Sequence, residues 1–135
     1  VERGRMVGAG GRQPLLECLR YPDRRVQYDT ALVLGAAGLL QGKRATTHWS
    51  AIKQLEGYGA IAADERVVTD GKIMTGAGVS AGIDMALTLL AEVAGDAHAQ
   101  FVQLMTEYDP QPPFNAGSLA KAPDAIRDRA LALFA

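Results

Sequence analysis

Three side chains that could do chemistry, Tyr28, Asp29 and Thr30, stand immediately before a run rich in Ala, Leu and Gly that extends to Leu40. This composition is unsuited to a strand and predicts a sharp turn that leads into a helix. Open α/β sheets place their reactive groups at such strand-to-helix turns. A carboxylate there can act as a nucleophile or base, and a tyrosine can pass protons. The alternative is that Asp29 or Thr30 only caps the helix, which contributes about 1 kcal/mol.

His48 is the second candidate, because it falls where a short buried strand over residues 45–47 is expected to end. A histidine in this place can orient a nucleophile or donate a hydrogen bond to a substrate. It can equally be satisfied by neighbouring backbone groups, and the sequence leaves both roles open. The other histidine, His98, is expected to be solvated on a helix surface. Neither histidine has Cys or carboxylate partners at the spacing of metal ligands, so no metal site is predicted.

The helix that follows the turn is expected to pack tightly and to end at a glycine. Gly35 and Gly38 are three residues apart, so they share one face and let another element approach closely. Gly42 is expected to supply the left-handed cap, with Lys43 and Arg44 at the negative end of the helix.

Beyond His48 the pattern alternates between helical and extended segments. The expected elements are a helix over 49–55, strands over 60–62, 66–69 and 72–75, a hairpin turn at Asp70-Gly71, a long helix after Ser80, a helix after Gly95-Asp96 and a last helix after Pro123. Apolar residues surround most of the long helix, which predicts deep burial. Strands that alternate with helices, plus one hairpin, predict an α/β sandwich with a mixed sheet.

Composition limits the class of protein and its partners. The 135 residues predict a single domain over 1–135, and 14 basic against 15 acidic side chains favour no nucleic-acid partner. The sequence contains neither an apolar run of membrane-spanning length nor a signal peptide, so no membrane partner and a cytoplasmic location are expected. One cysteine excludes an internal disulfide. Gly76-Ala77-Gly78 lacks the spacing of phosphate-binding motifs, and no cofactor is predicted.

Three blocks of sequence together resemble the ThiJ/PfpI superfamily, and specifically its isonitrile hydratase-like branch. They are the helix with its Gly-Lys-Arg cap and Ala-Thr-Thr-His-Trp over 31–49, the segments 64–72 and 75–84, and the segment 107–118. The resemblance implies a three-layer, flavodoxin/Rossmann-like mixed sheet of the class I glutamine amidotransferase-like type. Members of the family extend further at the N-terminus, so the chain is expected to begin at Val1 inside the family domain.

The resemblance also implies a reaction. Enzymes of this branch are lyases that add water to an isocyanide, R–N≡C, to give an N-substituted formamide, and they use a cysteine at the turn before the helix. Here Tyr28 or Asp29 takes the place of that cysteine, Thr30 matches a threonine, and His48 matches a position near the turn. The lone Cys18 lies on an earlier predicted helix and is interpreted as a packed thiol. Tyr28, Asp29, Thr30 and His48 are therefore the predicted site for a small-molecule substrate, and the alternative is a non-catalytic dimeric interaction or sensor module.

Two expectations concern surfaces. The loop over 109–118, with Tyr108 before it, could roof a small apolar pocket, or it could be a rigid linker to the last helix. If N-terminal strands are missing, one face of the sheet lacks a cover, and exposed apolar patches of that kind are usually buried. This predicts a homodimer that buries Leu32, Leu39 or Leu40 at least in part.

Overall fold

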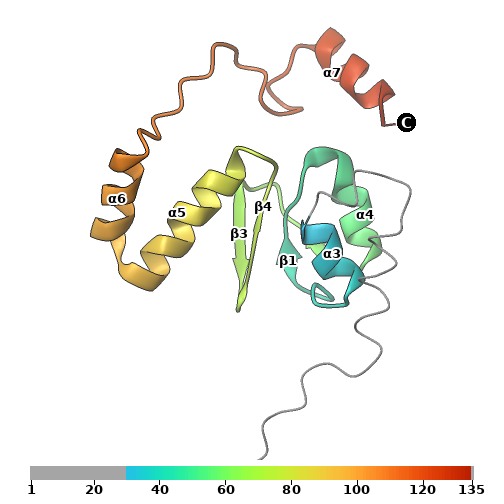
Figure 1. The fold of residues 1–135 in the computed structure, drawn as a ribbon. Coiled ribbons are helices and arrows are strands. Elements are labelled where there is room, and N and C mark those ends of the chain that lie inside the picture. Colours follow the sequence, from blue (N-terminus) through green and yellow to red (C-terminus); the bar gives the residue numbers. More distant parts are fainter. Residues whose placement is uncertain (1–29, 135) are drawn as a thin grey trace, which may run out of the picture.

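A computed structural model describes residues 30–134 (Figure 1). Its elements in chain order are α3 (Thr30–Ala36), β1 (Arg44–Ala45), the 3₁₀ turn η1 (Trp49–Ala51), α4 (Ile52–Gly57), β2 (Ile61–Ala62), β3 (Val67–Asp70), β4 (Ile73–Gly76), α5 (Ala81–Ala94), α6 (Asp96–Met105) and α7 (Asp124–Ala132). The predicted site residues Tyr28 and Asp29, like Cys18, lie outside the described residues. No helix of the described part has both the length and the apolar character needed to cross a membrane.

The described strands form two pairs of opposite orientation. β1 pairs with β2 in parallel, and β3 pairs with β4 in antiparallel register with Asp70 opposite Ile73. Side-chain acceptors link the two pairs, because the Arg44 N–H donates to the Asp70 carboxylate over 2.8 Å and the Thr46 N–H donates to Thr75 Oγ1 over 3.0 Å. Figure 1 shows α5 and α6 on one side of the strands and α3 and α4 on the other. The predicted α/β sandwich with mixed strand orientation is confirmed.

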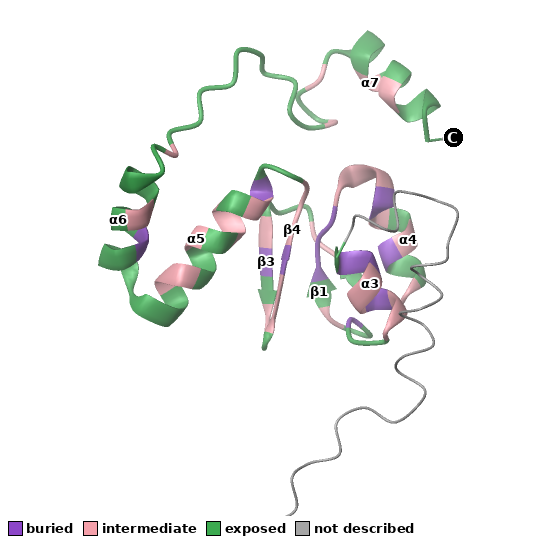
Figure 2. Cartoon of the chain, in the orientation of Figure 1, coloured by how far each residue is buried: buried purple, intermediate pink, exposed green. Residues whose placement is uncertain are grey.

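The apolar core lies where α3 and α4 meet β1 (Figure 2). Leu32, Leu40 and Leu55 are fully buried there, at 0% exposure each. The expectation that a second copy of the chain covers Leu32 or Leu40 is therefore wrong, because both side chains are already packed inside this chain. Leu39, in contrast, is 53% exposed. Leu39 and Leu40 differ in exposure because both follow the end of α3, where the turn directs neighbouring side chains apart.

The end of α3 is a Schellman turn built on Gly38. Gly38 has φ 76°, its N–H donates to the Gly35 carbonyl over 2.8 Å, and the Leu39 N–H donates to the Leu34 carbonyl over 3.0 Å. The cap is therefore Gly38 and not Gly42, which has φ 69° in the next turn and donates to the Gly59 carbonyl. Gly38 has open space where a Cβ would stand, so only Gly35 fulfils the predicted close approach.

Replacing Gly35 with alanine is expected to destabilise the fold. A Cβ at this position would lie 2.9 Å from Cδ2 and 3.1 Å from Cβ of Tyr58, both too close for a normal contact. The overpacking cost of about 1–3 kcal/mol exceeds the roughly 1 kcal/mol that alanine gains over glycine within a helix. Urea denaturation measures the difference. Gly57→Ala in α4 is the control, since no heavy atom lies within 4 Å of its added Cβ, and equal stabilities of the two variants would contradict this account.

The long helix α5 is less buried than the sequence predicts. Only Ala81 is fully buried, whereas Ile83 and Leu89 are exposed and Val93 is 78% exposed. Among the described elements α5 contacts β3, β4 and α6, and these cover only part of its circumference. Periodicity shows which helix faces are apolar, but it does not show what covers them.

The segment after α6 is a connection and not a roof. Residues 109–118 are exposed along their whole length, and they do not line the cavity described below. Tyr108 alone is half-buried. The linker interpretation of this proline-rich segment agrees with the structure.

Candidate functional site

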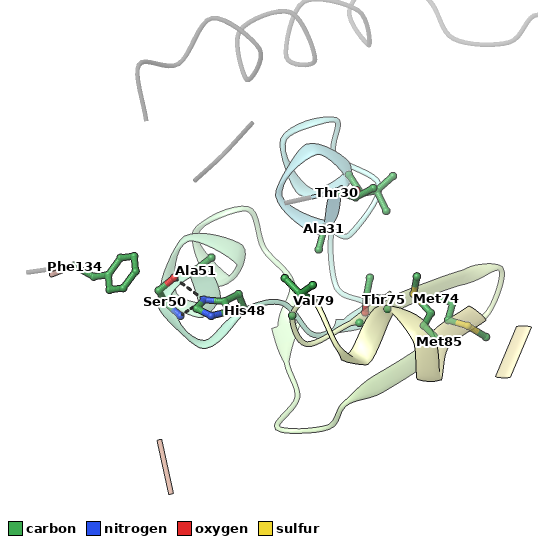
Figure 3. Close-up of a pocket in the computed structure, with 14 residues that line it drawn as sticks. Thr30, Ala31, His48, Ser50, Ala51, Met74, Thr75, Val79, Met85 and Phe134 are labelled. Carbon is green, nitrogen blue, oxygen red and sulfur yellow. Dashed lines mark hydrogen bonds between the residues drawn. The ribbon is translucent and has the colours of Figure 1, made fainter. Parts of the chain in front are cut away.

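A cavity of about 540 Å³ opens between the start of α3, the residues around η1, strand β4 and the start of α5 (Figure 3). Its described lining is mostly apolar and consists of Thr30, Ala31, Leu34, His48, Ser50, Ala51, Met74, Thr75, Gly76, Gly78, Val79, Gly82, Met85 and Phe134. In Figure 3, His48 and Ser50 lie at the same end as Phe134, and Met74 and Met85 lie at the other. Apolar walls with a few neutral polar groups suit a small uncharged organic molecule.

Two of the four predicted site residues line this cavity. Thr30 is the first residue of α3 and is exposed, and His48 immediately precedes η1 and is half-buried. The two residues are brought together because α3 and the segment after β1 flank the same opening. Tyr28 and Asp29, which precede Thr30 directly in the chain, remain predictions.

The position of His48 depends on Ser50. The imidazole Nδ1 lies 2.8 Å from Ser50 Oγ, and the Ser50 backbone N–H donates to the same nitrogen over 3.4 Å. A backbone N–H can only donate, so Nδ1 accepts and the proton of the neutral ring lies on Nε2. Nε2 has no hydrogen-bonding partner among residues 30–134. The local bonds to Nδ1 correspond to the second role that the sequence left open, and the role of His48 toward a nucleophile or a substrate remains a prediction.

Gly78 allows the chain to pass close to this imidazole. It has φ 124°, which favours glycine, and a Cβ there would lie 3.4 Å from His48 Cδ2. A larger residue would therefore be strained by its backbone conformation and would also crowd the histidine ring. The same loop continues into Val79, which forms part of the cavity wall.

Several lining residues were not predicted from the sequence. Ser50 had a readable signal, since a serine two residues after a histidine at a helix start can bond its ring. Thr75 is buried in β4 and accepts from the Thr46 N–H. Met85 and Phe134 have no local signal, because only the packing of α5 and α7 brings them to the cavity. Within residues 30–134 no cluster of three or more His, Cys, Asp or Glu could hold a metal ion.

A polar cluster of Arg66, Ser80, Asp84 and Tyr108 lies next to the loop of Gly78 and Val79. Arg66 Nε donates to Asp84 Oδ2 over 2.6 Å, and its Nη2 donates to Ser80 Oγ over 3.3 Å. The Tyr108 hydroxyl donates to Asp84 Oδ1 over 2.6 Å. The Tyr108 hydrogen bond, together with Arg66, holds the pKa of Asp84 below its ordinary value, and the same bond raises the pKa of Tyr108. Ser80 precedes α5 as predicted, but its hydroxyl accepts from Arg66 and makes no cap bond.

This cluster predicts a pH-dependent loss of stability. A carboxyl group with a lowered folded-state pKa stabilises the fold above its unfolded pKa, and the stabilisation is lost as pH falls through the folded value. Asp84→Asn is therefore expected to melt at a lower temperature than the parent chain at neutral pH, and the two melting temperatures should converge below the ordinary pKa of 3.8. Thermal unfolding across this range measures the difference. Asp64→Asn, at an exposed position outside the cluster, is the control, and a difference that is independent of pH would contradict the prediction.

Comparisons with known proteins agree with this architecture. Residues 29–92 match the model of the DJ-1/PfpI family. The chain is 49% identical over 134 residues to the isonitrile hydratase of Pseudomonas putida, and the alignment covers 91% of this chain and 59% of that protein. A ThiJ/PfpI family protein from Pseudomonas syringae is similar in structure, with a TM-score of 0.74 and 51% identity over 76% of this chain and 43% of that chain.

A more distant solved structure shares the fold as well. Schizosaccharomyces pombe DJ-1 has a TM-score of 0.51 and 28% identity, over 62% of this chain and 42% of that chain. The chain thus spans less than two thirds of the length of each of these three relatives. The family match includes Thr30 and His48, and it confirms the resemblance predicted from the three sequence blocks.

Proposed function

We propose that this chain, which matches the DJ-1/PfpI family over residues 29–92 and is similar to an isonitrile hydratase, adds water to the isocyanide carbon of a small R–N≡C molecule and releases an N-substituted formamide. The observation that carries the proposal is the apolar cavity that Thr30 and His48 both line. An isonitrile is small and uncharged, and its R group suits walls made of alanine, methionine and valine. Its terminal carbon holds a lone pair that can accept a hydrogen bond from His48.

The proposed reaction conserves every atom of the water. The water oxygen bonds to the terminal carbon, one proton of the water is taken up by a base, and that proton is returned to the same carbon. The product R–N=CH–OH then tautomerises to the formamide R–NH–CHO. Negative charge develops on the carbon during attack, and a donor aimed at developing charge contributes strongly to catalysis.

Each candidate residue has a role in this scheme. His48 donates from Nε2 to the terminal carbon, with its ring held by Ser50. The Thr30 hydroxyl, at the cavity wall, holds the attacking water. Asp29 or Tyr28, which stand where the family's cysteine is expected, would supply the base.

The decisive experiment incubates the purified chain with cyclohexyl isocyanide in ¹⁸O-labelled water. The proposal expects N-cyclohexylformamide that carries the label, detected by mass spectrometry and formed faster than in buffer alone. If the formamide forms no faster than it does in buffer alone, hydration by this chain is ruled out.

A second candidate is a binding module that takes up a small apolar molecule without converting it. The observation in its favour is that the described lining offers apolar surface and neutral hydroxyl groups around one imidazole. Saturable binding of cyclohexyl isocyanide without formamide formation would select this candidate. The expected homodimer and cytoplasmic location remain predictions, and sedimentation equilibrium at micromolar concentration tests the first of these.

A further inference from the structure

Three aromatic rings form a row at one end of the cavity, and the first and last of them line it. The His48 and Trp49 rings have centroids 5.0 Å apart at 39°, and the Trp49 and Phe134 rings have centroids 5.1 Å apart at 83°. The second geometry is the edge-to-face arrangement that aromatic pairs prefer. Phe134 also lines the cavity itself, at the end where His48 and Ser50 lie (Figure 3). The row therefore joins the candidate site to the C-terminal end of the described chain.

Phe134 is carried by a helix that has little other support among the described residues. It follows α7, and its N–H donates to the Leu131 carbonyl over 3.0 Å. None of the residues of α7 is buried, and Figure 1 shows that a long connection without regular structure separates α7 from α6. Elements with few buried contacts are the ones that open most readily.

Trp49 borders a small hollow next to α7. This hollow, of about 130 Å³, is lined by Trp49, by three residues of α7 and by the segment before α7, namely Ile126, Arg127, Ala130, Ala116, Gly117, Ser118, Leu119 and Ala122. Trp49 thus borders the same hollow as α7, and its ring meets the Phe134 ring edge to face. One residue next to His48 is therefore close both to the hollow beside the helix and to the phenyl ring that follows the helix.

We propose that α7 and the Phe134 that follows it form a lid, which reaches the cavity through the Phe134 ring and selects the ligand by size. The proposal rests on the proposed function for the identity of the ligand. Phe134 lines the cavity together with His48 and is 37% exposed, so part of this residue is accessible to a bound molecule. A bulky apolar R group would reach the ring, whereas a methyl group held at His48 would leave it untouched.

Substrate discrimination tests the lid. Phe134→Ala is expected to raise KM for cyclohexyl isocyanide by roughly tenfold, to leave kcat within about twofold, and to leave KM for methyl isocyanide unchanged, because a lost apolar contact acts on binding. Phe134→Leu should restore part of the affinity. Leu133→Ala is the matched control, since Leu133 is the neighbouring residue, is exposed and does not line the cavity. Equal losses for both isocyanides, or an unchanged KM for the larger one, would overturn the proposal.

Trp49 provides a readout that does not depend on turnover. It is the single tryptophan of the chain, so the fluorescence signal comes from one known position. Removing the Phe134 ring is expected to raise acrylamide quenching of Trp49 by about twofold, and Leu133→Ala should not change it. Unchanged quenching in Phe134→Ala would overturn the lid whether or not the chain makes formamide. Raised quenching in a chain without hydratase activity would support the lid and reject only the proposed function.

Discussion

Substitution of His48 by alanine is expected to lower kcat/KM for isonitrile hydration by about 10²–10³-fold, the usual loss when one donor to developing charge is removed. The expectation follows from the ring geometry. Ser50 occupies Nδ1, so Nε2 carries the proton and is the donor to the isocyanide in the proposed reaction. Alanine removes that donor and opens space without touching Thr30 or the α3 turn. Because the charge forms only as water attacks, the loss should fall mainly on kcat.

Two further variants show whether the loss is specific to His48 and to the hydrogen bond that holds its ring. His98→Ala is the control, because His98 is the other of the two histidines and is exposed on α6. Ser50→Ala keeps the ring of His48 but removes the hydroxyl bound to Nδ1, so its rate should fall between those of the parent and His48→Ala. If His48→Ala hydrates cyclohexyl isocyanide at the parental rate, His48 is not part of the chemistry.

The parts of this structure that the sequence predicts well are those decided by a few adjacent residues. Asp70-Gly71 predicted a hairpin, and β3 and β4 pair with Asp70 opposite Ile73 and with Gly71 at φ 65°. The strand predicted over residues 45–47 is in part wrong, because β1 ends at Ala45, and Thr46 and Thr47 lead to His48 without regular structure. In the hairpin a local conformational preference and the final packing agree, so the pattern alone is sufficient.

The errors arise where the outcome depends on distant packing. Gly42 and Gly38 both adopt positive φ, and composition does not show which of the two the helix will use as its cap. The apolar circumference of α5 indicates burial but cannot name a cover. Phe134 is far from His48 in sequence, and nothing near it in the chain indicates that it lines the same cavity. Pairings of this kind are set by how whole elements dock.

Substitution of Leu40 tests whether this side chain stabilises the core of the chain or a contact between subunits. Leu40 is fully buried with Leu32 and Leu55 in the core of this chain, whereas its neighbour Leu39 is half exposed. Truncating a buried leucine removes its transfer free energy and leaves a cavity, so Leu40→Ala is expected to lower the free energy of unfolding by about 2–5 kcal/mol. Leu39→Ala, at a surface position, should change it by no more than about 0.5 kcal/mol.

Protein concentration separates the two explanations for Leu40. A side chain buried inside one chain affects unfolding equally at every concentration, whereas a side chain at a dimer contact affects a stability that rises with concentration. Urea denaturation of the parent chain, Leu40→Ala and Leu39→Ala over a hundredfold range of concentration therefore gives a direct answer. If Leu40 lies in the core, Leu40→Ala is expected to lower the free energy of unfolding by the same amount throughout that range. A loss that grows with concentration, or one of the same size in Leu39→Ala, would indicate that Leu40 lies at a subunit contact. Because natural domains are stable by only about 5–15 kcal/mol, the expected loss is a large share of the total.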